Sequence, residues 1–293
     1  MTRHELSEKH FNSIMELKGA DELKATVKRL HIFLENKETH LLNDITLPNH
    51  LWVIKRGGGV STLVKFFTEY LYAARAIDFC GTVKSFEFKL DYIAPDAFFS
   101  ELTRLDNTIS GLAGHHRQYK GVVCVNIDEW LEHTSEVHFS NFLDYIASNN
   151  DRLLVIFYTH NESKNIIDAA ETALSSHLRV EMLSLRFPDA TELIDFVEAK
   201  HIKSRGFSFT EDARTLLYES IVELAAGKHF KGFKSVEQLA NDILYSVLSS
   251  DLGENKKITA NMIIGYGKDS IYVKRAKAQI GIRKVIGFAE RSV

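Results

Sequence analysis

Short, almost unbroken apolar runs recur over the first two thirds of the chain and are separated by amphipathic segments. The runs at 51–55, 122–127 and 153–158 have the length and composition of strands that are covered on both faces. The segment 84–90 (KSFEFKL) instead alternates apolar and charged positions, which is typical of an edge strand with one less protected face. Because helical patterns separate these runs, we predict a doubly wound α/β sheet with parallel strands.

Helical periodicity covers the segments between the predicted strands and most of the chain after about residue 190. In 62–77 the apolar side chains recur at helical spacing, and 138–149 and 162–174 can hold further helices. After about residue 190, three helical patterns follow one another with no strand between them. We therefore predict an N-terminal helical segment (1–45), an α/β domain (46–190) and a helical domain with a C-terminal tail (191–293).

Charged residues are numerous but balanced in sign. The chain of 293 residues has 36 basic and 39 acidic residues, a net charge of −3, and its basic residues are scattered. This distribution does not indicate binding to nucleic acid or to an anionic membrane. The N-terminus lacks the apolar core of a signal peptide, and no segment reaches the roughly 20 apolar residues that span a bilayer. We expect a cytoplasmic protein.

Cysteines and histidines do not follow the spacing of a metal site. The two cysteines, Cys80 and Cys124, lie in apolar surroundings and are expected to be buried thiols. One pair of histidines is adjacent and another is five residues apart, so surface positions are favoured over metal ligation for His115, His116, His133 and His138.

A glycine turn follows the first predicted strand and precedes a predicted helix. The segment 57–62 reads GGGVST, and Gly57, Gly58 and Gly59 allow the backbone to approach an anion closely. In a phosphate loop, the hydroxyl of Ser61 would bind Mg²⁺. The alternative is that these glycines form only a turn between a strand and a helix.

An acidic pair follows the predicted strand at 122–127. Asp128 and Glu129 stand where a Walker B pair would hold the metal and polarise the attacking water. The alternative is an acidic start to a helix, since carboxylates are favourable near a helix N-terminus.

The order of these segments resembles an AAA+ module of the P-loop NTPase-like class, and within it the CbxX/CfxQ and stage V sporulation protein K group. The resemblance covers roughly residues 14 to 265. It is carried by the helix at 15–30, the strand and acidic pair at 121–130, the segment 153–197, and the lid helices at 206–221 and 231–242. It implies a parallel five-stranded sheet in the order 5-1-4-3-2, a C-terminal helical lid, and ATP or ADP with Mg²⁺ as ligands.

The family's functional positions can be placed on this sequence one by one. The phosphate loop falls on Gly57, Gly58, Gly59, Val60, Ser61 and Thr62, with Val60 in place of the lysine. The resemblance assigns the Walker B acids to Asp128 and Glu129, the metal to Ser61 and Asp128, and the sensor-1 polar group to Thr159 or Asn161. The arginine finger falls on His177 and the sensor-2 arginine on Lys234. The acids are therefore kept, whereas three cationic positions are changed.

These substitutions favour a degenerate AAA+ module, a pseudo-ATPase that serves assembly or regulation, with weak or absent ATP binding and hydrolysis. The alternative is a nucleotide-binding AAA+ ATPase that hydrolyses ATP slowly to remodel a protein partner, with Lys55, Arg56 or Arg179 replacing a lost cation. A dinucleotide-dependent enzyme is disfavoured, because Thr62 stands where that fingerprint requires its last small residue. By resemblance we also expect self-association or co-assembly with an active AAA+ subunit.

Overall fold

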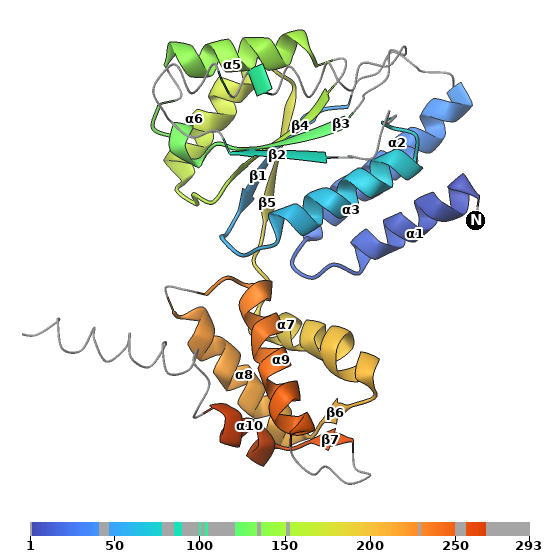
Figure 1. The fold of residues 1–293 in the computed structure, drawn as a ribbon. Coiled ribbons are helices and arrows are strands. Elements are labelled where there is room, and N and C mark those ends of the chain that lie inside the picture. The colour runs from blue at the N-terminus through green and yellow to red at the C-terminus, as the bar shows by residue number, and fades with distance from the viewer. Residues whose placement is uncertain are drawn as a thin grey trace, which may run out of the picture. The chain divides into compact units, whose positions relative to one another are not determined.

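The chain folds into two compact units in the computed structural model (Figure 1). The structure describes residues 2–40, 47–77, 85–89, 100, 103–104, 121–133, 136–150, 153–227, 230–249 and 256–267. Unit 1 consists of residues 1–55 and 59–187, and unit 2 of residues 56–58 and 188–293. Cys80 and the adjacent histidines, His115 and His116, lie outside the described residues.

A five-stranded parallel sheet forms the centre of unit 1. Its strands are β1 (Asn49–Ile54), β2 (Ser85–Lys89), β3 (Gly121–Asn126), β4 (Leu153–Thr159) and β5 (Val180–Leu185). The strand order is β2-β3-β4-β1-β5, and every neighbouring pair is parallel. The predicted α/β fold class and the 5-1-4-3-2 order are thus confirmed, with the alternating segment as edge strand β2.

Helices cover both faces of this sheet, as Figure 1 shows. On one face lie α1 (Arg3–Met15), α2 (Asp21–His40) and α3 (Val60–Ala73), and on the other lie α5 (Val137–Ser148) and α6 (Lys164–Ser175). Each face has its own apolar core, built around Trp52 and Phe67 on the first face and around Phe157 and Phe142 on the second. Double coverage explains why β1 and β4 are buried at every position.

Unit 2 is mainly helical. Its helices are α7 (Ala190–Val197), α8 (Glu211–Ala225), α9 (Phe233–Leu248) and α10 (Ala260–Gly267), and a π-helical turn (Glu198–Ile202) and a short 3-10 helix (Lys203–Arg205) follow α7 directly. The expectation that no strand occurs here was wrong, since Ser208–Phe209 (β6) pairs in parallel with Lys257–Ile258 (β7). These strands are two residues long, too short to produce a strand pattern in the sequence. In the described part of the chain, no helix combines the length and apolarity that crossing a membrane requires.

Candidate functional site

The glycine turn joins the end of β1 to the start of α3. Gly57 and Gly59 have φ angles of 86° and 84°, in the region where a side chain is strained. Gly59 is the N-cap of α3, and its carbonyl accepts a hydrogen bond from the Leu63 amide at 3.0 Å. The first amides of this 14-residue helix have no carbonyl partner within it, so they form the kind of backbone donor set that binds anions.

The side chains that follow the glycines differ in their surroundings. Val60 is only 8% exposed and belongs to the apolar core that contains Leu63, Val64 and Phe67. Ser61 and Thr62 are exposed in the first turn of α3. The residue predicted to replace the phosphate-loop lysine is thus a core residue, whereas the two hydroxyls predicted for the loop lie at the surface.

Asp128 lies at the carboxyl end of β3, in the three-residue 3-10 helix Asp128–Trp130 (η1). Its Oδ1 accepts hydrogen bonds from Thr159 Oγ1 at 2.8 Å and from the His160 amide at 2.7 Å. Asn126 contacts the other carboxylate oxygen. Its side chain accepts a hydrogen bond from the Asp128 amide at 2.9 Å and donates one to Asp128 Oδ2 at 3.3 Å. The carboxylate is therefore held in one orientation by residues from the ends of β3 and β4.

The residues after β4 extend this network. Thr159 is fully buried, and its Oγ1 also accepts from the Asn161 amide at 2.9 Å, while Asn161 Oδ1 accepts from the Ser163 amide at 2.8 Å. His160 Nδ1 lies 2.8 Å from the carbonyl oxygen of Ile54, the last residue of β1. Since a carbonyl only accepts, Nδ1 carries the proton and donates it. His160 thus connects Asp128 to the residue that leads into the glycine turn.

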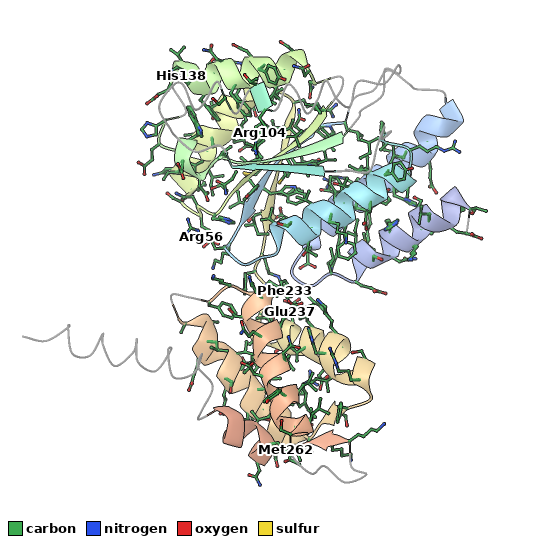
Figure 2. The ribbon with its side chains drawn as sticks, viewed as in Figure 1. Arg56, Arg104, His138, Phe233, Glu237 and Met262 are labelled. Carbon is green, nitrogen blue, oxygen red and sulfur yellow. The ribbon has the colours of Figure 1, made fainter. Side chains whose placement is uncertain are left out.

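The residues at or near the predicted cationic positions lie outside the Asp128 network. His177, which the resemblance places at the arginine-finger position, is paired with the Asp144 carboxylate through Nδ1 at 2.8 Å. Lys55 forms an exposed ion pair with Glu162 at 3.4 Å, a type of pair that contributes little to stability. Arg56, labelled in Figure 2, is exposed, and no side-chain partner is found for it among the described residues. Arg179 is also exposed and lies directly before β5.

Lys234 belongs to unit 2, where it is exposed in the first turn of α9. Its neighbour Phe233 packs edge to face on Phe196, with ring centroids 4.8 Å apart. Further along α9, Glu237 pairs with Lys200 of the π-helical turn, and Figure 2 labels both Phe233 and Glu237. These contacts anchor the start of α9 to the end of α7 within unit 2.

The donor set fits a phosphate in part. The glycine turn, the helix amides and the Ser61 hydroxyl suit an anion, whereas buried Val60 brings no charge. In the described part of the chain, no cluster of three or more histidine, cysteine, aspartate or glutamate side chains could hold a metal ion by itself. A Mg²⁺ ion here would thus depend on Asp128, Ser61 and ligand oxygens, which is how this ion binds in many nucleotide sites.

Known proteins resemble this chain in fold but not in sequence. No protein-family model matches the chain, and no curated protein does so either. A solved structure of PCH-2 from C. elegans aligns over 92% of this chain and 72% of that one, with a TM-score of 0.55 and 13% sequence identity. The two chains share their fold, in agreement with the predicted P-loop NTPase-like α/β class. This likeness concerns the architecture, and the CbxX/CfxQ relationship remains a prediction.

The structure of unit 1 brings part of the predicted site together. Asp128, Thr159 and Asn161 belong to one hydrogen-bonded network at the carboxyl ends of β3 and β4. Sequence reasoning missed Asn126 and His160. Both are polar residues next to predicted ones at the ends of apolar runs, and that position was the one available indication in the sequence.

Proposed function

We propose that this chain is a degenerate AAA+ module that acts as an assembly or regulatory subunit and hydrolyses ATP weakly or not at all. The observation that supports this most directly is Val60, which is buried in the α3 core at the position aligned with the phosphate-loop lysine. A charge-assisted hydrogen bond contributes about 1.5–3 kcal/mol, so its loss weakens nucleotide binding about 10- to 100-fold.

Hydrolysis depends on cations more strongly than binding does. Positive groups stabilise the charge that develops on the transferred phosphoryl group, and an arginine finger supplies about 10³–10⁵ in rate. At the aligned position this chain has His177, which is paired with Asp144. With the lysine and the finger both replaced, we expect turnover to be very slow.

The chain's own residues retain a nucleotide-binding role in this proposal. The amides at the start of α3 would bind phosphate oxygens, and Ser61 and Asp128 would hold Mg²⁺, while Thr159 and His160 keep the Asp128 carboxylate oriented. Mg²⁺ would supply positive charge that compensates the phosphate oxygens. These residues suit a subunit whose assembly responds to nucleotide.

A second candidate is an AAA+ ATPase that hydrolyses ATP slowly to remodel a protein partner. It is favoured by the complete network around Asp128 and by Arg56, an exposed cation directly before the glycines. In both cases we expect protein partners, either copies of this chain or an active AAA+ subunit. The AAA+ fold supports this expectation.

Calorimetric titration with ATP-Mg²⁺ and with ADP tests nucleotide binding. We expect a dissociation constant in the millimolar range, weakened further in Ser61→Ala. The matched control is Ser175→Ala, an exposed serine at the end of α6, which leaves binding unchanged. A dissociation constant in the micromolar range would contradict the proposal that replacement of the lysine weakens nucleotide binding. Equal effects of Ser61→Ala and Ser175→Ala would contradict the assignment of residues 57–62 as the phosphate loop.

Phosphate release separates the two candidates. The assembly subunit is expected to release phosphate more slowly than about 10⁻² per second, the order found for GTPases with an arginine in place. Faster release that disappears in Asp128→Asn establishes the remodelling ATPase instead. The same assay on Arg56→Gln reports whether that arginine supplies the missing charge.

A further inference from the structure

Gly57 belongs to unit 2, although the strand before the glycine turn and the helix after it belong to unit 1. A Cβ added to Gly57 would lie 2.5 Å from the carbonyl carbon of Lys231, 2.6 Å from the nitrogen of Gly232 and 2.8 Å from the carbonyl oxygen of Lys231. Real Cβ atoms do not approach other atoms so closely. The peptide bond between Lys231 and Gly232 therefore packs directly on the α-carbon of Gly57.

This peptide is fixed to the first turn of α9. The Lys231 amide donates to Ser235 Oγ at 2.8 Å, and the Gly232 carbonyl accepts from the amides of Ser235 at 3.0 Å and Val236 at 3.2 Å. Gly232 is the N-cap of α9, with a φ of 58° and a ψ of −130°, a combination that a side chain disfavours. A shift of the peptide away from Gly57 would thus disturb the cap of α9.

Two features of the structure favour glycine at position 57, its positive φ and this close contact. Gly206, which also belongs to unit 2, has only the first feature, with a φ of 78° against 86° at Gly57. A Cβ added to Gly206 would meet only side-chain atoms of Lys256, at 3.7 and 3.9 Å, which is ordinary van der Waals contact. A comparison of the two glycines therefore separates backbone strain from packing.

We propose that Gly57 is a packing glycine, whose missing side chain lets the Lys231–Gly232 peptide close on the segment 56–58. The contact shields this peptide bond and supports the start of α9, so its opening would release the segment 56–58 and the first turn of α9 together. No phosphate at Gly57 is needed for this role. The inference does not rest on the proposed function, which uses the α3 amides and Ser61.

Trypsin tests the contact, because Lys231 is exposed and the bond that follows it is the one that packs on Gly57. The measurement is the initial rate of cleavage after Lys231 in the full chain, followed by mass spectrometry without nucleotide. In Gly57→Asn we expect this rate to rise at least about tenfold, since local opening of the contact exposes the bond. Asparagine tolerates the left-handed region, so the added Cβ acts mainly through the contact.

The matched control is Gly206→Asn, which places the same side chain at a similar φ without the close approach. There we expect cleavage after Lys231 to stay within about twofold of the parent rate. An unchanged rate in Gly57→Asn, or an equal rise in both variants, overturns the proposal.

A comparison within the parent chain does not depend on how the variants fold. Arg205 is exposed and is also followed by a glycine, but an added Cβ on that glycine would make no close contact. We expect trypsin to cut after Lys231 at least about tenfold more slowly than after Arg205. Equal rates at the two bonds would show that the Lys231–Gly232 bond is not shielded, and the proposal would then be wrong.

Discussion

At Asp128, one carboxylate oxygen accepts two hydrogen bonds, from Thr159 Oγ1 and from the His160 amide. Thr159 is fully buried and its hydroxyl both donates and accepts, so it is the residue on which the orientation of Asp128 depends most. Its contribution can be measured without nucleotide.

Replacement of Thr159 by valine keeps the shape of the side chain and removes its hydroxyl. Because Asp128 loses a donor and the Asn161 amide loses an acceptor, we expect the free energy of unfolding in urea to fall by about 1–3 kcal/mol. The matched control is Thr172→Val on α6, whose exposed hydroxyl donates only to the Asp168 carbonyl. There we expect a change below about 0.5 kcal/mol. A loss at Thr159 no greater than at Thr172 would show that the network contributes nothing.

His50 makes the stability of the fold depend on pH. Its pKa is about 4 in the folded chain and 6.5 in the unfolded one, so between these values only the unfolded state takes up the proton. This difference in pKa contributes about 3 kcal/mol to the free energy of unfolding above pH 6.5. The contribution is lost as the pH falls toward 4. The charged group that acts on the ring is Arg29 on α2, and Arg179 before β5 and Glu181 on β5 line a cavity together with His50.

The measurement is the free energy of unfolding at pH 7 and at pH 4.5, in the parent chain and in His50→Asn. The variant lacks the titrating ring, so the difference in stability between the two chains is expected to shrink at the lower pH. Carboxylates titrate in both chains and cancel in this comparison. A difference that stays constant between the two pH values rules out the assigned behaviour of His50.

At the scale of single elements, the start of α3 depends on Gly59. Its φ of 84° is left-handed, and the helix begins at the next residue. In Gly59→Ala, the added Cβ strains this conformation, and we expect a loss of about 1–2 kcal/mol in thermal or urea unfolding. Gly59→Asn is expected to lose less, since asparagine tolerates the left-handed region and caps helices well. If alanine is tolerated better than asparagine, the assigned cap conformation is wrong.

The elements of unit 1 differ in how well the pattern predicted them. The apolar runs of β1, β3 and β4 were visible because both faces of each strand are covered, and β2 was visible from its alternation. For β5, periodicity alone gave no strand. Val180 and Glu181 are half-buried and Met182 is exposed, so this edge strand lacks an apolar run and entered the predicted sheet through the family resemblance.

The helical pattern of 189–206 concealed a change of helix type. The structure has α7 to Val197, then a π-helical turn over Glu198–Ile202 and a 3-10 helix over Lys203–Arg205. The π-helical turn includes His201, which is 8% exposed, and burial lowers its pKa. One extra residue in a turn scarcely changes the spacing of apolar positions, so periodicity cannot detect it.

The same limit applies to the candidate site. The glycine turn and the acidic pair were predicted from the residues, and Thr159 and Asn161 from the resemblance. The contacts of Asn126 and His160 depend on how the ends of β1, β3 and β4 are aligned in the sheet, and strand register is a tertiary property that a single sequence does not encode locally.

For the whole molecule, the proposed function requires association with other chains. We expect light scattering to report a mass that is a multiple of the single chain and that rises with protein concentration, because the resemblance of the sequence to AAA+ modules implies self-association. Addition of millimolar ATP-Mg²⁺ is expected to shift this equilibrium in the parent chain and less in Ser61→Ala. A single-chain mass at all concentrations, with and without nucleotide, contradicts self-association and leaves co-assembly with another AAA+ subunit as the remaining form of the proposal.

His160 has a consequence that extends beyond its own contacts. Its amide binds the Asp128 carboxylate, and its ring binds the carbonyl at the end of β1. One residue thus contacts both the acidic side chain and the peptide at the end of β1. We expect Asp128 and His160 to be energetically coupled, so the costs of substitutions at these two residues should not add in a double-mutant cycle.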